Sequence, residues 1–229
     1  MRMTQKQLLS IIDRIDGKGY KAYKDLEGSY SFDKFKLYVD HVQGDPYATP
    51  SKFRVRCNNT FSKDCLKNKS REIALRDYLT RQFHKLTCTV KSLIKIDKPG
   101  QEVLERTSVI VTQDYVEARF RVNLPAFGRR IAGKHAKEIF MQDIPGIVLK
   151  SLFSEALNKE DLEKHLQVCE DADSLRNQIC QQGLVAFVAN GSILPRKSGI
   201  DDKPLDNAVP FNSPKEMLFE FQLPGRTVK

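Results

Sequence analysis

The sequence predicts an α/β protein of the α+β kind, with a mixed sheet and helices first and an antiparallel β-subdomain last. Apolar residues recur at helical spacing in several segments and at every second position between them, the period of a half-buried strand. The charge also divides along the chain, because residues 1–150 carry a net charge of +12 and residues 151–229 one of −3. We therefore expect a basic N-terminal domain at 1–157 and a second domain at 158–229.

The basic part begins with a helix and then alternates strands with helices. Residues 4–16 have one apolar helical face, and Thr4 is a suitable N-cap. Residues 35–41 and 53–57 alternate apolar with charged or polar side chains, which predicts two half-buried strands. Residues 71–86 predict a second amphipathic helix.

The middle of the chain continues this pattern. Strands are predicted at 92–97 and 108–122, and Gln113 lies at the tip of a possible hairpin within the second segment. A helix is predicted from about residue 129 to 142, up to the interruption at Pro145.

The end of the chain predicts helices followed by a hairpin. Asn158 can cap a long helix and Gly183 can end it. Asn190-Gly191 is a strong hairpin turn signal. The predicted elements are helices at 147–157 and 159–182, a hairpin at 184–194 and a strand at 217–223.

Composition excludes several classes of protein. The five cysteines form no CxxC pair, so we expect free thiols and no zinc site. No apolar run is long enough to cross a bilayer, and the first residues lack the apolar core of a signal peptide. We therefore expect no membrane partner and a cytoplasmic location. The basic first part suggests a polyanionic partner.

Residues 128–135, GRRIAGKH, have the glycine and lysine spacing of a P-loop. His135 stands where that loop needs a hydroxyl, and imidazole is a poor ligand for Mg²⁺. Two other interpretations stay open. Arg129, Arg130 and Lys134 can start a helix whose free N–H groups bind nucleic-acid phosphate, or the arginines can simply face solvent.

Two strand patterns, KFRVR and ARFR, alternate arginine with apolar residues. If these strands share a sheet, four guanidinium groups lie on one face and can bind phosphate oxygens. The alternative is ion pairing of these groups with Asp40 and Glu117 on a solvated face. The four candidates are Arg54, Arg56, Arg119 and Arg121.

Tyr20, Tyr23 and Tyr30 alternate with lysines, a pattern also found where single-stranded nucleic acid stacks on aromatic rings. Packing at the edge of the core is the favoured interpretation for these three rings.

Several long stretches together resemble one family. In order, they are DGKGYKAYKDLEGSY, HVQGDPYATPSKFRVR, RFRVNLPAFGRRIAG, GLVAFVANGSILPRKSG and VPFNSP. They resemble the predicted ATPases of the ABC class over about residues 5 to 224. The resemblance implies a basic N-terminal domain followed by the opening β-subdomain of an ATP-binding cassette. It also implies RNA as a partner, and ATP and Mg²⁺ as cofactors of the full-length proteins.

In that family a P-loop of the form GGGxHGKST comes shortly after the position of Lys229, and this sequence contains no such loop, Walker B strand or ABC signature. We therefore expect a truncated cassette without the Walker A and B motifs, no cofactor for this chain alone and no ATP hydrolysis by it. Whether the chain is an enzyme stays open. By resemblance, Phe211 or Phe187 stacks on adenine, and Arg196 and Lys197 lie nearest the nucleotide.

The sequence thus favours the nucleic-acid-binding region of an ABC-class ATPase, with RNA as the expected ligand. One alternative is a protein-interaction or dimerisation module, acting in a homodimer or with the remainder of the ATPase. Another is an ATP-binding protein with a divergent P-loop at 128–135.

Overall fold

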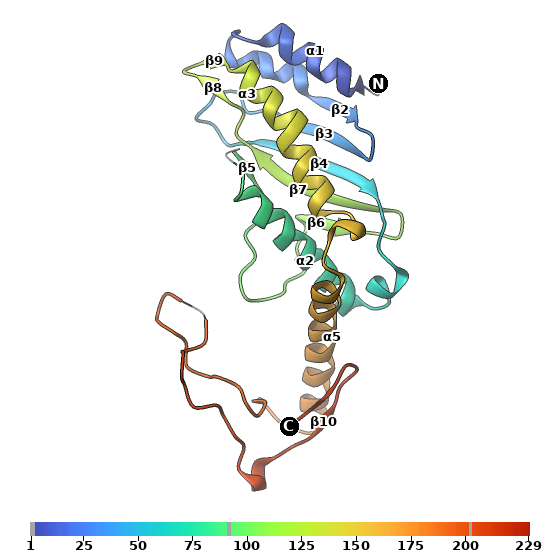
Figure 1. Ribbon diagram of the computed structural model, residues 1–229, viewed down its shortest axis with the longest axis vertical. Coiled ribbons are helices and arrows are strands. Elements are labelled where there is room, and N and C mark those ends of the chain that lie inside the picture. The colour runs from blue at the N-terminus through green and yellow to red at the C-terminus, as the bar shows by residue number, and fades with distance from the viewer. Residues whose placement is uncertain (1–2, 91–92, 202) are drawn as a thin grey trace. The chain divides into compact units, whose positions relative to one another are not determined.

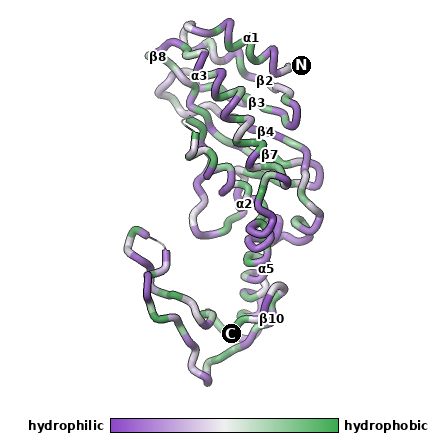
Figure 2. Tube along the Cα trace, in the orientation of Figure 1, coloured by the Kyte–Doolittle hydropathy of each residue, from purple (hydrophilic) through white to green (hydrophobic). Residues whose placement is uncertain are grey.

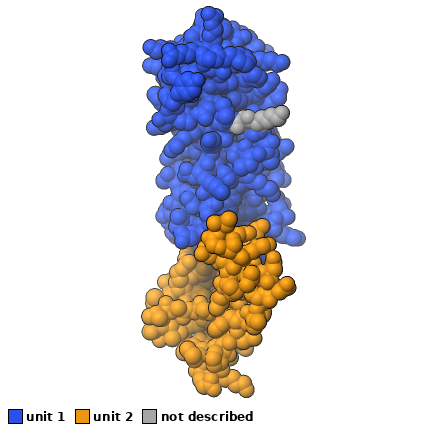
Figure 3. Space-filling model, turned by 90° about the vertical axis from the view of Figure 1, so that its left-hand side faces the viewer, with its two compact units in different colours: residues 1–165 blue, residues 166–229 orange. Residues whose placement is uncertain are grey.

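The computed structural model describes residues 3–90, 93–201 and 203–229. Helices and strands mix throughout, so the predicted α/β class is confirmed. The chain divides into two compact units, residues 1–165 and residues 166–229, which Figure 3 shows in different colours. The division falls within the helix Lys159–Gln181, whereas the predicted domain boundary lies just before this helix, between residues 157 and 158.

A mixed sheet forms the centre of the first unit (Figure 1). Its order among the described residues is β1-β2-β3-β4-β7-β5, with β6 also paired to β7. β1 and β2 are parallel and the other neighbours are antiparallel. The bounds are β1 Met3–Thr4, β2 Gly28–Ser31, β3 Phe35–His41, β4 Ser51–Asn58, β5 Ile94–Lys95, β6 Val109–Val111 and β7 Tyr115–Val122.

The strands predicted at 35–41, 53–57 and 108–122 are therefore confirmed, the last as a hairpin around Gln113. The strand predicted at 92–97 is present at Ile94–Lys95, and its Ser92 lies outside the described residues. Figure 2 shows hydrophobic and hydrophilic residues alternating along these strands.

One face of the sheet is covered by helices. The Phe53 ring on β4 lies 5.7 Å from that of Phe140, and the Phe120 ring on β7 lies 5.3 Å from that of Phe83 in α2. Phe53 and Phe120 are register partners, so both helical segments pack on the same face. The bounds are α1 Gln5–Ile15, α2 Lys69–Thr87, α3 Gly133–Glu138, the π-helical η3 Ile139–Asp143, α4 Ile144–Ser151 and the 3-10 segments η1 Tyr20–Leu26, η2 Lys63–Leu66 and η4 Ser154–Ala156.

The first two helices begin where local capping predicts. Thr4 and Gln7 form a reciprocal capping box, in which the Gln7 N–H donates to Thr4 Oγ1 at 3.3 Å. Asn68 Oδ1 accepts from the Arg71 N–H at 2.9 Å. Both predicted helices are confirmed to within two residues.

The helix predicted from about residue 129 starts later. Gly128 has a φ of +59°, a conformation that glycine adopts without strain, and it turns the chain into a hairpin. The hairpin strands are β8 Ala126–Phe127 and β9 Arg130–Ile131. Pro145 does not interrupt the helical segment, because the π-helical turn η3 precedes it, and the Ile144 N–H closes that turn by donating to the Ile139 carbonyl.

The three tyrosines of the lysine-rich segment belong to the core, as favoured. Tyr20, Tyr23 and Tyr30 are at most 4% exposed. Their hydroxyls donate to the carbonyl oxygens of Leu124, Pro125 and Leu26 at 3.0, 2.7 and 2.9 Å. Burial raises the pKa of Tyr30 to about 12. These rings are therefore not available for base stacking.

The long helix α5, Lys159–Gln181, is capped by Asn158, whose Oδ1 accepts from the Glu160 N–H at 3.0 Å. Gly183 follows its end with a φ of +70°, as predicted. Among the described residues of the second unit, the regular strands are β10 Phe221–Gln222 and β11 Thr227–Val228, which are antiparallel, and η5 Lys215–Met217 is a 3-10 turn.

The predicted hairpin at 184–194 is wrong, although Asn190-Gly191 does form a turn. The turn residues bond to distant backbone instead of to flanking strands. The Asn190 N–H donates to the Lys229 carbonyl and the Gly191 N–H to the Phe211 carbonyl, both at 2.8 Å. The strand predicted at 217–223 is shortened to β10.

None of the helices in the described part of the chain combines the length and the hydrophobicity that crossing a bilayer requires.

Candidate functional site

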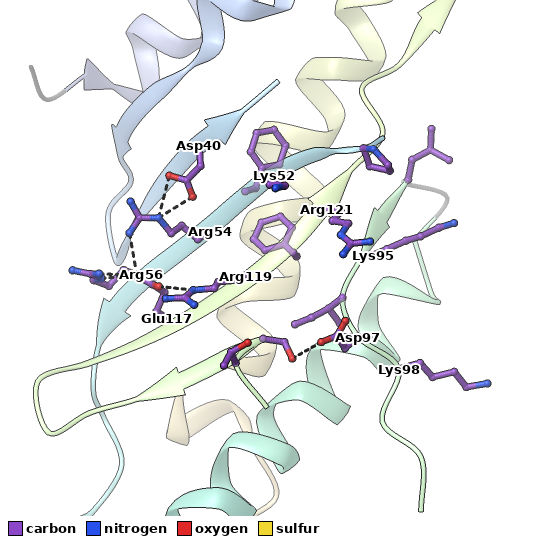
Figure 4. A pocket seen from close by; sticks show the side chains of 17 residues that line it. Asp40, Lys52, Arg54, Arg56, Lys95, Asp97, Lys98, Glu117, Arg119 and Arg121 are labelled. Carbon is purple, nitrogen blue, oxygen red and sulfur yellow. Dashed lines mark hydrogen bonds and ion pairs between the residues drawn. The ribbon is translucent and has the colours of Figure 1, made fainter. Parts of the chain in front are cut away.

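A pocket of about 860 Å³ lies on the sheet face opposite the helices (Figure 4). It is lined by β4, β7, the end of β3 and the segment around β5. Seven cationic side chains and three carboxylates line it, so the pocket is strongly basic. The cations are Lys52, Arg54, Arg56, Lys95, Lys98, Arg119 and Arg121, and the carboxylates are Asp40, Asp97 and Glu117.

The strand register brings the four predicted strand arginines together. β4 and β7 are antiparallel neighbours, with Arg54 opposite Arg119 and Lys52 opposite Arg121. Arg56 lies two residues from Arg54, so it projects to the same face. The structure therefore places all four predicted arginines on one face of the sheet.

Three of these arginines surround one buried carboxylate. The Glu117 side chain is 2% exposed, and its Oε2 accepts from Arg56 Nη2 at 2.7 Å and from Arg54 Nη1 at 3.2 Å. Its Oε1 accepts from Arg119 Nε at 3.0 Å. Arg54 Nε also donates to Asp40 at 2.8 Å. We call Asp40, Arg54, Arg56, Glu117 and Arg119 the paired cluster.

Hydrogen bonding keeps the paired cluster ionised. Burial alone would raise the pKa of Glu117, but the hydrogen bonds from Arg56 and Arg119 outweigh it and lower that pKa below its ordinary value. Burial acts to lower the pKa of Arg54, and the bond to Asp40 reverses the direction, so this pKa is raised. The ion pairing with Asp40 and Glu117 that the sequence left open is therefore present.

Two tyrosines hold the guanidinium groups of the paired cluster in place. The Arg54 Cζ lies 4.1 Å from the centre of the Tyr38 ring, and the Arg56 Cζ lies 4.2 Å from that of Tyr115. Such stacking fixes the plane of a guanidinium group while leaving its remaining N–H donors available.

At the other end of the pocket, the cations have no carboxylate partner among the residues that the structure describes. We call Lys52, Lys95, Lys98 and Arg121 the cation end. No ion pair joins any of these four side chains to another of the described residues. Asp97 lies nearby, and its Oδ2 accepts from Ser108 Oγ at 3.0 Å. Figure 4 shows Arg121, Lys95 and Lys98 apart from the paired cluster.

Three residues of the cation end were not among the predicted contacts. Lys52 could have been found, because it precedes Arg54 by two residues and so shares its face. Lys95 and Lys98 carry no such signal, since their segment has only a two-residue strand.

The P-loop interpretation of residues 128–135 does not fit the structure. The Gly133 N–H, at the start of α3, donates to Asp16 Oδ1 at 2.7 Å. A phosphate bound there would meet a carboxylate, and residues before Gly133 form a hairpin instead of a phosphate-binding loop. The first turn of α3 therefore offers neither a P-loop nor a free anion site.

Arg129 and Arg130 precede α3, and neither they nor Lys134 line the pocket. The Arg129 side chain is 83% exposed, and its Nε lies 3.9 Å from Asp45 Oδ2. The predicted position of Arg129 and Arg130 in the first turns of a helix is thus wrong.

The predicted nucleotide contacts lie in the second unit. The Lys197 Nζ forms an ion pair with Asp206 at 3.0 Å, and the Phe211 N–H donates to the Ser192 carbonyl at 2.9 Å. Phe187 packs edge-on against Phe221, with ring centres 5.3 Å apart. Among the described residues there is no cluster of acidic, histidine and cysteine side chains that could hold Mg²⁺.

Two family models match this chain. One, described as the N-terminal part of ATPases of the ABC class, matches residues 5–155. The other, the P-loop domain of ABC ATPases, matches residues 158–229. No curated protein sequence matches the chain.

Proposed function

The chain belongs to the ATPases of the ABC class, and we propose that its N-terminal domain, residues 1–157, binds nucleic acid, with RNA as the expected ligand. The observation that carries this proposal is the excess of cations over carboxylates in the pocket on the helix-free sheet face. Lysine and arginine side chains gathered on one face are the electrostatic footprint of a nucleic-acid-binding protein.

The two ends of the pocket contribute differently to the proposed binding. Lys52, Lys95, Lys98 and Arg121 supply most of the net positive charge. Arg54, Arg56 and Arg119 are partly neutralised by Glu117, but a guanidinium group has five N–H donors, and those not directed at Glu117 or Asp40 can bond to phosphate oxygens. Arg129, Arg130 and Lys134 lie outside the pocket and provide at most a further phosphate contact.

The P-loop domain suggests ATP and Mg²⁺ as cofactors of the family. For this chain we propose Phe211, Arg196 and Lys197 as nucleotide contacts. We also propose that residues 1–229 do not hydrolyse ATP alone, because the G-x(4)-G-K spacing is followed by His135 and its last glycine bonds to Asp16. The cytoplasm is the location we propose.

Salt dependence of RNA binding tests the nucleic-acid proposal. Fluorescence anisotropy with a labelled single-stranded RNA, over a series of salt concentrations, should give a log–log slope of about −3, since each of four neutralised phosphates contributes about −0.7. Reversing the charge of the cation end, in a Lys52→Glu/Arg121→Glu variant, should reduce binding strongly. Absent binding by the parent, or a slope near zero, would refute the proposal.

A second candidate function is contact with another copy of the chain. The second unit exposes large apolar side chains, among them Val185 and Ile200, which are fully exposed, and Val209 at 88%. A contiguous patch of exposed apolar residues marks a contact surface, and these side chains are the candidates for one. A monomer at all concentrations in sedimentation velocity would exclude this function.

A further inference from the structure

One of the three carboxylates that line the pocket differs from the other two. Glu117 accepts hydrogen bonds from three arginines, and Asp40 accepts from Arg54. Asp97 forms no ion pair with any residue that the structure describes, although the cation end lines the same pocket. In Figure 4 it lies on the side of the cation end, away from the paired cluster. A carboxylate that no cation neutralises therefore stands among the cations that are proposed to bind phosphate.

The strand register arranges most of the cation end as a row beside Asp97. Lys52 on β4 is the register partner of Arg121 on β7, and Arg121 is that of Lys95 on β5. The Cβ atoms of directly opposite residues lie about 5 Å apart, so these three cations follow one another across three strands. The alternation continues after Lys95, with Ile96 buried and Asp97 exposed. Asp97 therefore projects to the side that carries the row.

A buried serine holds the Asp97 side chain in place. Ser108 is 6% exposed, and its Oγ donates to Asp97 Oδ2 at 3.0 Å. The Ser108 carbonyl accepts from the Arg119 N–H of β7 at 2.7 Å, which ties this serine to the sheet. No other donor among the described residues bonds to Asp97. Because an ionised carboxylate only accepts, and does so at both oxygens, its remaining acceptor sites are available to a ligand in the pocket.

A carboxylate of this kind opposes phosphate binding unless the ligand brings a hydrogen-bond donor to it. Phosphate and carboxylate carry the same sign of charge and repel each other. RNA has a suitable donor, because its ribose carries a 2′-hydroxyl on the carbon next to the one that bears the 3′-phosphate. A backbone whose phosphate lies on the row of cations thus brings a hydroxyl close to the row, where Asp97 can accept from it. DNA lacks this hydroxyl.

Resting on the proposed function, we propose that Asp97, held by Ser108, accepts the 2′-hydroxyl of a bound ribose and so makes the pocket select RNA over DNA. The selection has two parts. RNA gains a charge-assisted hydrogen bond, which is stronger than a bond between neutral groups. DNA instead meets an unpaired negative charge, and such repulsion of the wrong ligand is a second source of specificity.

Two oligonucleotides that differ only in the hydroxyl measure the selection. Fluorescence anisotropy of the whole chain with labelled oligouridine and oligodeoxyuridine of equal length should show about tenfold tighter binding of the ribose form, the size of one charge-assisted hydrogen bond. A 2′-fluoro oligouridine keeps the sugar pucker of RNA but offers no donor, so it should bind like the deoxy form. If it binds like RNA instead, the pocket reads the shape of the sugar, and the role of Asp97 is overturned.

Removing the carboxylate should abolish the selection. In an Asp97→Ala variant the affinities for RNA and DNA should differ by less than about twofold, because the hydrogen bond and the repulsion are both removed. Asp40→Ala is the matched control, since it removes the same charge from the same pocket but from a carboxylate that Arg54 already neutralises. It should strengthen the binding of both ligands and keep the ratio of the parent. Urea denaturation checks that both variants are folded.

The outcomes separate the two proposals. Equal affinity of the parent for RNA and DNA, or a preference for RNA that Asp97→Ala retains, overturns the role of Asp97 and leaves the nucleic-acid function standing. Failure of the parent to bind either oligonucleotide removes both proposals.

Discussion

The two ends of the pocket use the same residue types in opposite ways. At the paired cluster, three arginines surround the buried Glu117, and Tyr38 and Tyr115 stack on two of them. At the cation end, Lys52 and Arg121 occupy the same face one step along the same two strands, but no described carboxylate pairs with them. The difference separates charge that stabilises the fold from charge that is available to a ligand.

The largest expected effect comes from removing the centre of the paired cluster. A Glu117→Leu substitution leaves three arginines close together without their shared partner, and should lower the free energy of unfolding by about 3 kcal/mol. Urea denaturation of both proteins measures this. As control, Asp40→Asn removes a carboxylate that is 40% exposed and should cost under about 1 kcal/mol. Equal losses for the two variants would show that Glu117 is not the centre of the cluster.

The second comparison concerns binding. A Lys52→Gln/Arg121→Gln variant should bind single-stranded RNA about tenfold more weakly, and its salt slope should be less steep by about 1.4, because two phosphate contacts are lost. An Arg54→Gln/Arg56→Gln variant should lose less affinity, because Glu117 and Asp40 already neutralise part of that charge. Anisotropy titrations of the two variants in parallel decide this. A greater loss at Arg54 and Arg56 would contradict the division of the pocket into two ends.

Local patterns were sufficient to predict most elements of the first unit. Because side chains alternate along a strand, Arg54 and Arg56 were predicted on one face, and Thr4 was predicted as the residue that caps α1. Where prediction failed, distant contacts decided the structure. Asn190-Gly191 turns the chain as expected, but Lys229 and Phe211 supply its hydrogen-bond partners, so no local hairpin forms.

The candidate site, too, could be predicted only in part from the local sequence. Spacing predicted that each pair of arginines shares one face of its strand, but bringing the four together and giving them partners depends on the pairing of β4 with β7, whose register puts Arg56 opposite Glu117. Neither this register nor the position of Lys95 and Lys98 has a signal in the local sequence. The division into a paired cluster and a cation end therefore required the structure.

The smallest expected effect is a pH dependence confined to the paired cluster. The pKa of Glu117 is lowered in the folded protein. In the unfolded chain a glutamate has a pKa of about 4.3. The stabilisation that Glu117 provides is thus complete above about pH 5 and is lost as the pH falls through the lowered value, because the unfolded chain then binds the proton more tightly. Other carboxylates also titrate in this range, and the pKa of Asp77 is lowered too, through bonds from His165 and Arg81 that outweigh its burial.

A Glu117→Gln variant isolates the contribution of Glu117. The free energy of unfolding of the parent minus that of the variant should shrink by about 1 kcal/mol between pH 6 and pH 3, whereas Lys52→Gln should show the same pH dependence as the parent. Urea denaturation at several pH values measures both differences. A constant difference between the parent and Glu117→Gln would mean that the arginines do not depend on the charge of Glu117, and the paired cluster would then be held together by packing on Tyr38 and Tyr115 instead.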